Sequence, residues 1–415
     1  MIQFNDVASQ WQEISNETHI SEDIEDFLQH GPYILGEQVK RFESEFAKYC
    51  GANYAVGISS GTDALKLAIQ ALLPLLPSDT EILIPANAHI SSMLAPAYFN
   101  RKTILIDCDQ NHNIDIEQIA GHCNACDKHH LIIATHMYGH PVDIPKIKTF
   151  KKSTVIEDCS HAHGATIDGQ HVGTFGDIGI FSLYPTKNLG AVGDAGIIIT
   201  NNENRYSHLM SLRNYGQFED DYNDIGWNNR LDEIQALILN EKLEHLDKWN
   251  DAKFVTAKLY DTFLTGIGDL VLPKLTNGRV FHIYQIRTTR RDQLRAYLKE
   301  KDIPTLIHYP RPLHETELFS YLKVLPKMTP RTDHYAKEIL SLPMHPYLTK
   351  KDTTTIAATI EEFFETYSCA GCGGHEELME HTDKLAGTYI CRWCARKAAG
   401  KIEDIINPTG RYRPV

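Results

Sequence analysis

The sequence has 415 residues, of which 42% are apolar and 23% are charged, and its net charge is −13. This length exceeds what one hydrophobic core usually supports, so we expect a soluble chain of two domains with an appendage. The acidic balance argues against general affinity for nucleic acid or anionic membranes. We find no signal peptide and no run of about 18 apolar residues, and the scattered cysteines suit a reducing compartment, so we expect a cytoplasmic protein.

Short apolar runs alternate with helical patterns through the first half of the chain. The runs are rich in β-branched residues and occupy 81–85, 103–107, 131–136, 154–158, 178–183 and 196–200. Strands of this kind, alternating with helices, predict a parallel sheet that is covered on both faces. Helical periodicity follows Gly61 and returns over 230–249. From about residue 251 to 364 the pattern becomes mixed α+β, which indicates a second, smaller domain.

Polar residues at the ends of these runs predict a cofactor site. Asp158 ends a strand, where open α/β sheets bind ligands, and a buried carboxylate there needs a cation. It could form an ion pair or a helix cap, or face the protonated pyridine nitrogen of pyridoxal phosphate (PLP). Gly61 and Thr62 open a helix whose amides can hold a phosphate, although Ser-Gly-Thr also fits a simple N-cap. Ser182 and Lys187 supply a second phosphate donor and an amine that can form a Schiff base.

Motifs over approximately residues 1–365 resemble those of DegT-type nucleotide-sugar aminotransferases, which belong to the aspartate-aminotransferase-like (fold type I) PLP enzymes. They include "GISSGTDAL", "VIEDCSHAHGA", "FSLYPTKNLGAVGDAGIIIT", "GWNNRLDEIQA" and "IHYPRPLH". The resemblance implies an α/β large domain over residues 1–250 with a mostly parallel seven-stranded sheet. It also implies that the N-terminal residues lie partly with a small α+β domain over 251–365.

The resemblance also implies a role for each matching residue. Lys187 would be the catalytic Schiff-base lysine. The other cofactor-binding residues would be Asp158 at the pyridine nitrogen, His161 at the phenolic oxygen, His89 on the ring face, and Gly61, Thr62, Asp63 and Ser182 at the phosphate. Asn228 would reach the phosphate of a neighbouring subunit, so a homodimer with shared active sites is expected. Tyr184, His308 and Tyr309 would lie near the sugar.

The implied reaction transfers an amino group from an amino acid, commonly glutamate, to a keto-sugar that is linked to a nucleotide. The "GTDAL" stretch favours members that act at a 3-keto position, whereas "EDCSHAHGA" also resembles members that aminate keto-cyclitols. His161 stands where many members have glutamine, and both residue types can donate a hydrogen bond. A third reading, a non-catalytic PLP-fold scaffold, is disfavoured because Lys187, Asp158 and Ser182 are all present.

The last segment, residues 366–415, carries two Cys-x₂-Cys pairs separated by eighteen residues. Their four cysteines are Cys369, Cys372, Cys391 and Cys394. This spacing predicts a zinc-ribbon-like module in which four thiolates close a tetrahedral structural site. Two disulfides or free thiols are the alternative. The basic end of the segment is a weak hint of nucleic acid, which we do not expect as a partner.

A third group of potential ligands lies in "GHCNACDKHH", which includes Cys123, Cys126, His129 and His130. It falls between a helical pattern and the 131–136 strand, where the family has an ordinary connection. We interpret it as a surface connection with incidental thiols and assign no metal to it.

Overall fold

The fold is described from a computed structural model, in which residues 2–321, 324–325 and 328–366 are described. The four cysteines of the predicted zinc ribbon lie outside these residues. None of the helices within the described ranges is long and apolar enough to cross a membrane.

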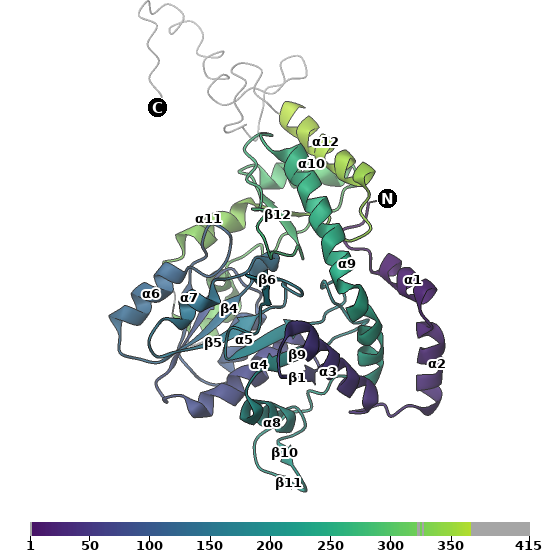
Figure 1. Ribbon diagram of the computed structural model, residues 1–415. Helices are drawn as coiled ribbons and strands as arrows, with labels where there is room; N and C mark the ends of the chain where they lie inside the picture. The colour runs from purple at the N-terminus through teal and green to yellow at the C-terminus, as the bar shows by residue number, and fades with distance from the viewer. Residues whose placement is uncertain (1, 322–323, 326–327, 367–415) are drawn as a thin grey trace, which may run out of the picture.

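A single large sheet forms the centre of the molecule (Figure 1). Its strand order is β1-β9-β8-β5-β4-β2-β3-β13. The strands are β1 (Tyr54–Ile58), β2 (Glu81–Pro85), β3 (Thr103–Ile106), β4 (His130–Thr135), β5 (Ser153–Asp158), β8 (Ile178–Ser182), β9 (Gly196–Thr200) and β13 (Val324–Leu325). Only β9 runs antiparallel to its neighbours, so the expected mostly parallel sheet of seven strands is confirmed. The two-residue β13 adds an eighth strand beside β3.

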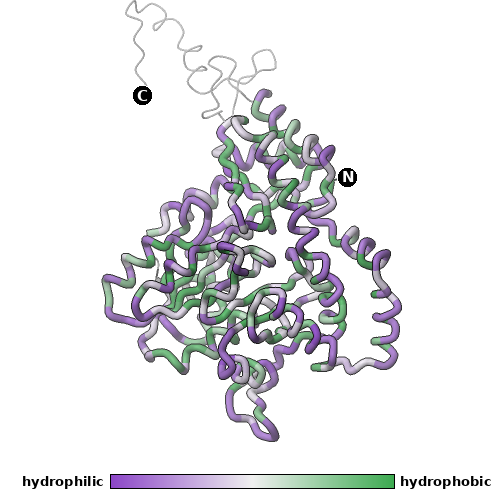
Figure 2. The backbone as a smooth tube through the Cα atoms, in the orientation of Figure 1, coloured by the Kyte–Doolittle hydropathy of each residue, from purple (hydrophilic) through white to green (hydrophobic). Residues whose placement is uncertain are grey.

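Helices cover both faces of the sheet because its strands are apolar on both faces. On β4, Leu131 and Ile133 pack against one hydrophobic cluster, whereas Ile132 packs against another on the opposite face. The first cluster includes α4 (Gly61–Leu72), α5 (Ser91–Ala97) and α8 (Glu203–Leu212), and the second includes α6 (Ile116–Ala125) and α7 (Ile144–Lys148). Beside the second cluster, α3 (Glu37–Cys50) covers β1, β9 and β8. Figure 2 shows the hydrophobic segments concentrated in these interior strands.

The 32-residue helix α9 (Glu233–Leu264) connects this sheet to a separate hydrophobic cluster (Figure 1). Its first half packs on α3 and its second half packs on α12 (Lys350–Thr366). The separate cluster also contains α10 (Arg291–Glu300) and the antiparallel pair β12 (Tyr284–Arg287) and β14 (Ile339–Leu342), with Ile2 packed against it. Residue 250, where we divided the two domains, lies inside α9, and the domain division stays a prediction.

The remaining elements lie outside the large sheet. Helices α1 (Val7–Glu17) and α2 (Ile20–His30) pack on α9, and α11 (Pro330–Glu338) precedes β14. Two hairpins are formed by β6 (Thr166–Ile167) with β7 (Gln170–His171) and by β10 (Gln217–Phe218) with β11 (Asp221–Tyr222). Short 3₁₀ turns occupy Leu73–Leu75, Met137–Gly139, Leu313–Glu315 and Glu317–Tyr321.

Candidate active site

A cavity of about 380 Å³ opens at the carboxyl edge of the sheet. Asp158 is the last residue of β5 and Ser182 is the last residue of the neighbouring parallel strand β8, so both side chains reach the same edge. The cavity is lined by ten of the predicted residues: Gly61, Thr62, His89, Asp158, His161, Ser182, Tyr184, Lys187, His308 and Tyr309. Residues that are far apart in the chain therefore meet in one site.

Lys187 lies in a tight turn just after β8. Its backbone amide donates to the carbonyl of Tyr184 (2.8 Å), which turns the chain back over the cavity. Gly190 permits this turn, because a Cβ at that position would lie 2.5 Å from the carbonyl oxygen of Pro185. Burial lowers the pKa of the Lys187 amine from 10.5 to about 8, although the carboxylate of Asp158 raises it. A substantial fraction of the amine is therefore neutral, and hence nucleophilic, near pH 8.

The carboxylate of Asp158 is buried and positioned from two sides. Its Oδ1 accepts the backbone amide of Ser160 (3.0 Å), and its Oδ2 accepts the hydroxyl of Thr135 (3.4 Å). Thr135 is opposite Asp158 in the ladder of β4 and β5. These contacts leave acceptor capacity for a cationic group inside the cavity.

The start of α4 fits an anion such as a phosphate. Ser60 caps the helix by accepting the amide of Asp63 (3.1 Å), while the amides of Gly61 and Thr62 have no partner one turn earlier in the helix. A Cβ at Gly61 would lie 2.5 Å from the Cβ of Ser182, so glycine allows the helix start to approach the end of β8. The cavity therefore presents two amides and a hydroxyl close together.

Asp63 lies outside the cavity lining. Its carboxylate accepts the hydroxyls of Ser59 (2.8 Å) and Ser60 (2.9 Å) and forms an ion pair with Lys66 (2.8 Å). Since its amide also serves the helix cap, a direct contact of Asp63 with a phosphate has no support in this structure.

Histidines form one wall of the cavity. The Nδ1 of His161 accepts the amide of Tyr138 (3.3 Å), and burial lowers the pKa of His161 well below 6.5. A neutral ring that accepts at Nδ1 carries its proton on Nε2, so His161 has a donor available for a ligand. His89 lies at the mouth, where its Nδ1 is 2.9 Å from Oγ of Ser91.

The predicted substrate residues line the outer part of the cavity. Tyr184 is exposed, whereas Tyr309 packs beside His89 with their ring centroids 5.4 Å apart. His308 is held by Ser341, whose Oγ lies 2.9 Å from its Nδ1. Burial lowers the pKa of His308 to about 4, so its ring is neutral near pH 7.

Asn228 is exposed and does not line this cavity. It forms an isolated bridge with Asn214, beside the exposed side chains of Ile225 and Trp227. The chain by itself therefore does not bring Asn228 to its own site.

Sequence reasoning missed His282, which is buried in the cavity wall with its ring centroid 4.7 Å from that of His161. In the described part of the chain nothing hydrogen-bonds its Nδ1. The available signal was a polar residue in the apolar "VFHIYQI" stretch. Thr135 and Ser160 were also missed because they only flank Asp158.

Comparisons with known proteins agree with this geometry. The chain is 32% identical over 370 residues to the dTDP-3-amino-3,4,6-trideoxy-alpha-D-glucose transaminase of Streptomyces venezuelae, covering 88% of this chain and 96% of the relative. It is 38% identical over 340 residues to the UDP-N-acetyl-3-dehydro-alpha-D-glucosamine 3-aminotransferase of Acidithiobacillus ferrooxidans, covering 80% and 90%.

Solved structures support both the fold and the cofactor. Streptomyces venezuelae DesV in complex with a ketimine intermediate superposes with a TM-score of 0.82 at 32% identity, covering 88% of this chain and 98% of that one. Bacillus subtilis ntda, solved with bound cofactor PMP, gives a TM-score of 0.76 at 26% identity and covers 83% and 81%. The predicted pyridoxal phosphate cofactor is thereby supported, and the cavity fits it through a buried lysine of lowered pKa, a buried carboxylate and the helix start. The family model of the DegT/DnrJ/EryC1/StrS aminotransferases matches residues 15–361, and the chain belongs to this family of pyridoxal-phosphate-dependent sugar aminotransferases.

Proposed function

We propose that this enzyme transfers an amino group from glutamate to the 3-keto group of a nucleotide-linked hexose. The observation that carries the proposal is the placement of Lys187, Asp158 and Ser182 in one cavity, beside the start of α4. When bound, pyridoxal phosphate supplies an electron sink and carries the amino group between the two substrates.

Each residue of the cavity has a role that follows from its chemistry. With the cofactor bound, the carboxylate of Asp158 would keep the ring nitrogen protonated, and Nε2–H of His161 would donate to the phenolic oxygen. The amides of Gly61 and Thr62 and the hydroxyl of Ser182 would hold the phosphate. Lys187, whose pKa is about 8, takes a proton from the substrate carbon and returns it in the second half of the reaction.

The substrate class rests on the relatives and on the residues at the cavity mouth. Both curated relatives described above are named for amination at position 3 of a nucleotide-linked sugar. His89, Tyr184 and Tyr309 offer apolar ring faces with polar tips at the mouth, which suits a sugar with its nucleotide extending outward. A keto-cyclitol is the alternative acceptor.

We further propose that two subunits share their active sites. Asn228 is exposed, and the large apolar side chains near it have high exposed fractions, 78% for Ile225 and 65% for Tyr98. A second copy that covers these side chains would also contact Asn228, which in our proposal then reaches the partner's cavity. The cytoplasmic location and the zinc ribbon stay predictions.

The test is a turnover screen with glutamate or glutamine against 3-keto and 4-keto nucleotide sugars and keto-cyclitols. We expect the 3-keto nucleotide sugars to give the highest kcat/KM. We expect Lys187→Ala to abolish turnover and the visible absorbance band of the bound cofactor. Full activity of Lys187→Ala would overturn the catalytic assignment, whereas preference for a cyclitol would overturn only the substrate class.

A further inference from the structure

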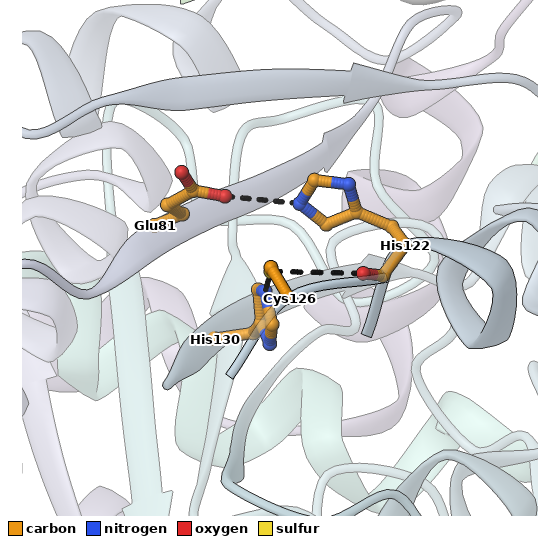
Figure 3. Close-up of side chains that lie close together, drawn as sticks. All are labelled: Glu81, His122, Cys126 and His130. Carbon is orange, nitrogen blue, oxygen red and sulfur yellow. Dashed lines mark hydrogen bonds and ion pairs between the residues drawn. The ribbon is translucent and has the colours of Figure 1, made fainter. Parts of the chain in front are cut away.

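Four potential metal ligands gather at the amino-terminal edge of the sheet (Figure 3). Glu81 begins β2 and His130 begins β4, and the two residues are opposite each other in the parallel ladder of these strands. His122 lies in the last turn of α6, and Cys126 follows that helix directly. Three separate elements therefore direct a carboxylate, two imidazoles and a thiol to one place.

The distances in this cluster suit a single ion. One ligand atom from each residue lies within 4.8 Å of every other. Nε2 of His122 is 3.0 Å from Oε2 of Glu81, and Nε2 of His130 is 3.5 Å from Sγ of Cys126. A tetrahedral site with metal–nitrogen bonds of about 2.0 Å and metal–sulfur bonds of about 2.3 Å has ligand–ligand edges of roughly 3.3–3.5 Å. Small movements of the side chains would therefore complete the coordination.

We propose that Glu81, His122, Cys126 and His130 bind one borderline-soft divalent ion, zinc or a close analogue, in a structural site. Thiolate and imidazole ligands select zinc-like ions over magnesium and calcium, which prefer oxygen ligands alone. This inference is independent of the proposed function. It also revises the interpretation of "GHCNACDKHH": Cys126 and His130 belong to the cluster, whereas Nε2 of His129 lies 2.9 Å from Oγ1 of Thr154 instead.

The protonation states of the cluster suit metal binding. Burial, with the neighbouring His122, lowers the pKa of His130 to about 4, so its ring is neutral near pH 7. Burial raises the pKa of Glu81, but hydrogen bonds from Lys102, Lys128 and His122 bring it down to about 2, so the carboxylate is ionised. On binding, Cys126 loses its thiol proton to solvent, and the nitrogen of each imidazole that binds the ion has to carry no proton.

The surroundings of Glu81 also favour a soft ion over a hard one. Its Oε1 accepts the ammonium groups of Lys102 (2.8 Å) and Lys128 (3.0 Å), which orient the carboxylate and leave Oε2 toward the cluster. Two nearby ammonium groups repel a cation that is held by charge alone, so the bonds to sulfur and nitrogen have to supply the affinity. This is a further reason to expect zinc rather than magnesium.

The position of the cluster assigns it a structural role. His130 begins β4, whereas Thr135, at the other end of that strand, contacts Asp158 in the active-site cavity. Five residues of strand span about 17 Å, so the ion would be remote from the reacting groups. It would fasten the end of α6 to the first residues of β2 and β4.

The test uses the full-length chain with the other predicted metal site removed. The parent variant replaces the tail cysteines by serine (Cys369→Ser, Cys372→Ser, Cys391→Ser and Cys394→Ser). After treatment with a chelator, the parent is titrated with Co²⁺ and the thiolate-to-cobalt charge-transfer absorbance is recorded. We expect one equivalent to bind with tetrahedral d–d bands, to raise the denaturation midpoint and to be displaced by Zn²⁺.

Matched variants decide which residues hold the ion. Cys126→Ser in the parent should abolish the charge-transfer band, and His122→Gln should weaken binding at least tenfold. Cys123→Ser and His129→Gln, which change neighbours outside the cluster, should bind as the parent does. Absence of the band in a folded parent, or its retention in Cys126→Ser, would overturn the proposal. Circular dichroism confirms folding, and His122→Gln decides the matter if Cys126→Ser does not fold.

Discussion

The start of α4 lies very close to the end of β8 in the candidate active site, and this contact predicts a large effect for Gly61→Ala. An added Cβ would lie 2.5 Å from Cβ, 2.9 Å from Cα and 3.0 Å from Oγ of Ser182. A different rotamer of Ser182 cannot relieve these contacts, because Cα and Cβ do not move with χ1. The helix start and the strand end therefore have to separate, at a cost of about 1–3 kcal/mol for overpacking.

The same separation should weaken cofactor binding, because the amides of α4 and the hydroxyl of Ser182 could no longer reach one phosphate together. Gly121→Ala is the matched control. It changes a glycine inside α6 where an added Cβ has nothing within 4 Å, so it should stabilise the fold by about 0.5–1 kcal/mol. It should leave cofactor affinity unchanged.

Both variants are measured as apoproteins by chemical denaturation, and PLP affinity is measured by fluorescence titration. We expect the free energy of unfolding to fall for Gly61→Ala and rise for Gly121→Ala, with at least a tenfold loss of PLP affinity for Gly61→Ala alone. If the free energy of unfolding of Gly61→Ala is within about 0.5 kcal/mol of that of the wild type, and the two bind PLP with equal affinity, the close approach of α4 to β8 is wrong.

Three further predictions follow from buried groups. Because burial lowers the pKa of Lys187 from 10.5 to about 8, the charged lysine destabilises the apoprotein below pH 8, and this penalty disappears as the pH rises to 10.5. Lys187→Met should therefore be about 3 kcal/mol more stable than wild type at pH 7 and equal to it near pH 10.5, and equal denaturation midpoints at pH 7 would refute this. His161→Gln should keep most of kcat, because the glutamine amide can also donate a hydrogen bond, whereas kcat of His161→Leu should fall at least tenfold. Equal kcat values for these two variants would show that His161 does not act as a hydrogen-bond donor. Glu157→Ala should lower the free energy of unfolding by at least about 3 kcal/mol, because this buried carboxylate accepts three backbone amides and faces a buried histidine. The exposed Glu117→Ala should change it by less than about 0.5 kcal/mol, and similar losses for both would contradict this reasoning.

The strands could be predicted from sequence because they are buried on both faces, and their β-branched runs are continuous. The boundaries predicted at 81–85 and 196–200 are those of β2 and β9. The antiparallel direction of β9 could not be predicted, because the apolar pattern of a buried strand is the same in either direction. The strand β1, "YAVGI", was missed, although it is as long as β8 and β9 and, like them, contains a glycine.

Those parts of the active site could be predicted whose polar residues lie at the ends of strands. Asp158 and Ser182 end adjacent strands, so the topology alone brings them together, and Lys187 follows within one turn. His282 enters from a segment almost a hundred residues later, and only the tertiary packing of that segment places it beside His161. The exposure of Asn228 likewise depends on a loop that no local pattern specifies.

The metal-ligand cluster shows why spacing along the chain is misleading where a helix passes into a strand. His122 and Cys126 are four residues apart, and so lie on one side of α6 and its end, whereas Cys123 packs against the hydrophobic cluster that contains Ile119 and Ile132. In β4 successive residues face opposite sides of the sheet, and His130 has the same parity as Ile132, which packs toward α6. Glu81 joins them only because β2 pairs with β4 in a register that sets it opposite His130. A grouping by proximity in sequence includes Cys123 and His129 and omits Glu81, whereas a grouping by helix face and strand pairing selects the residues whose ligand atoms meet.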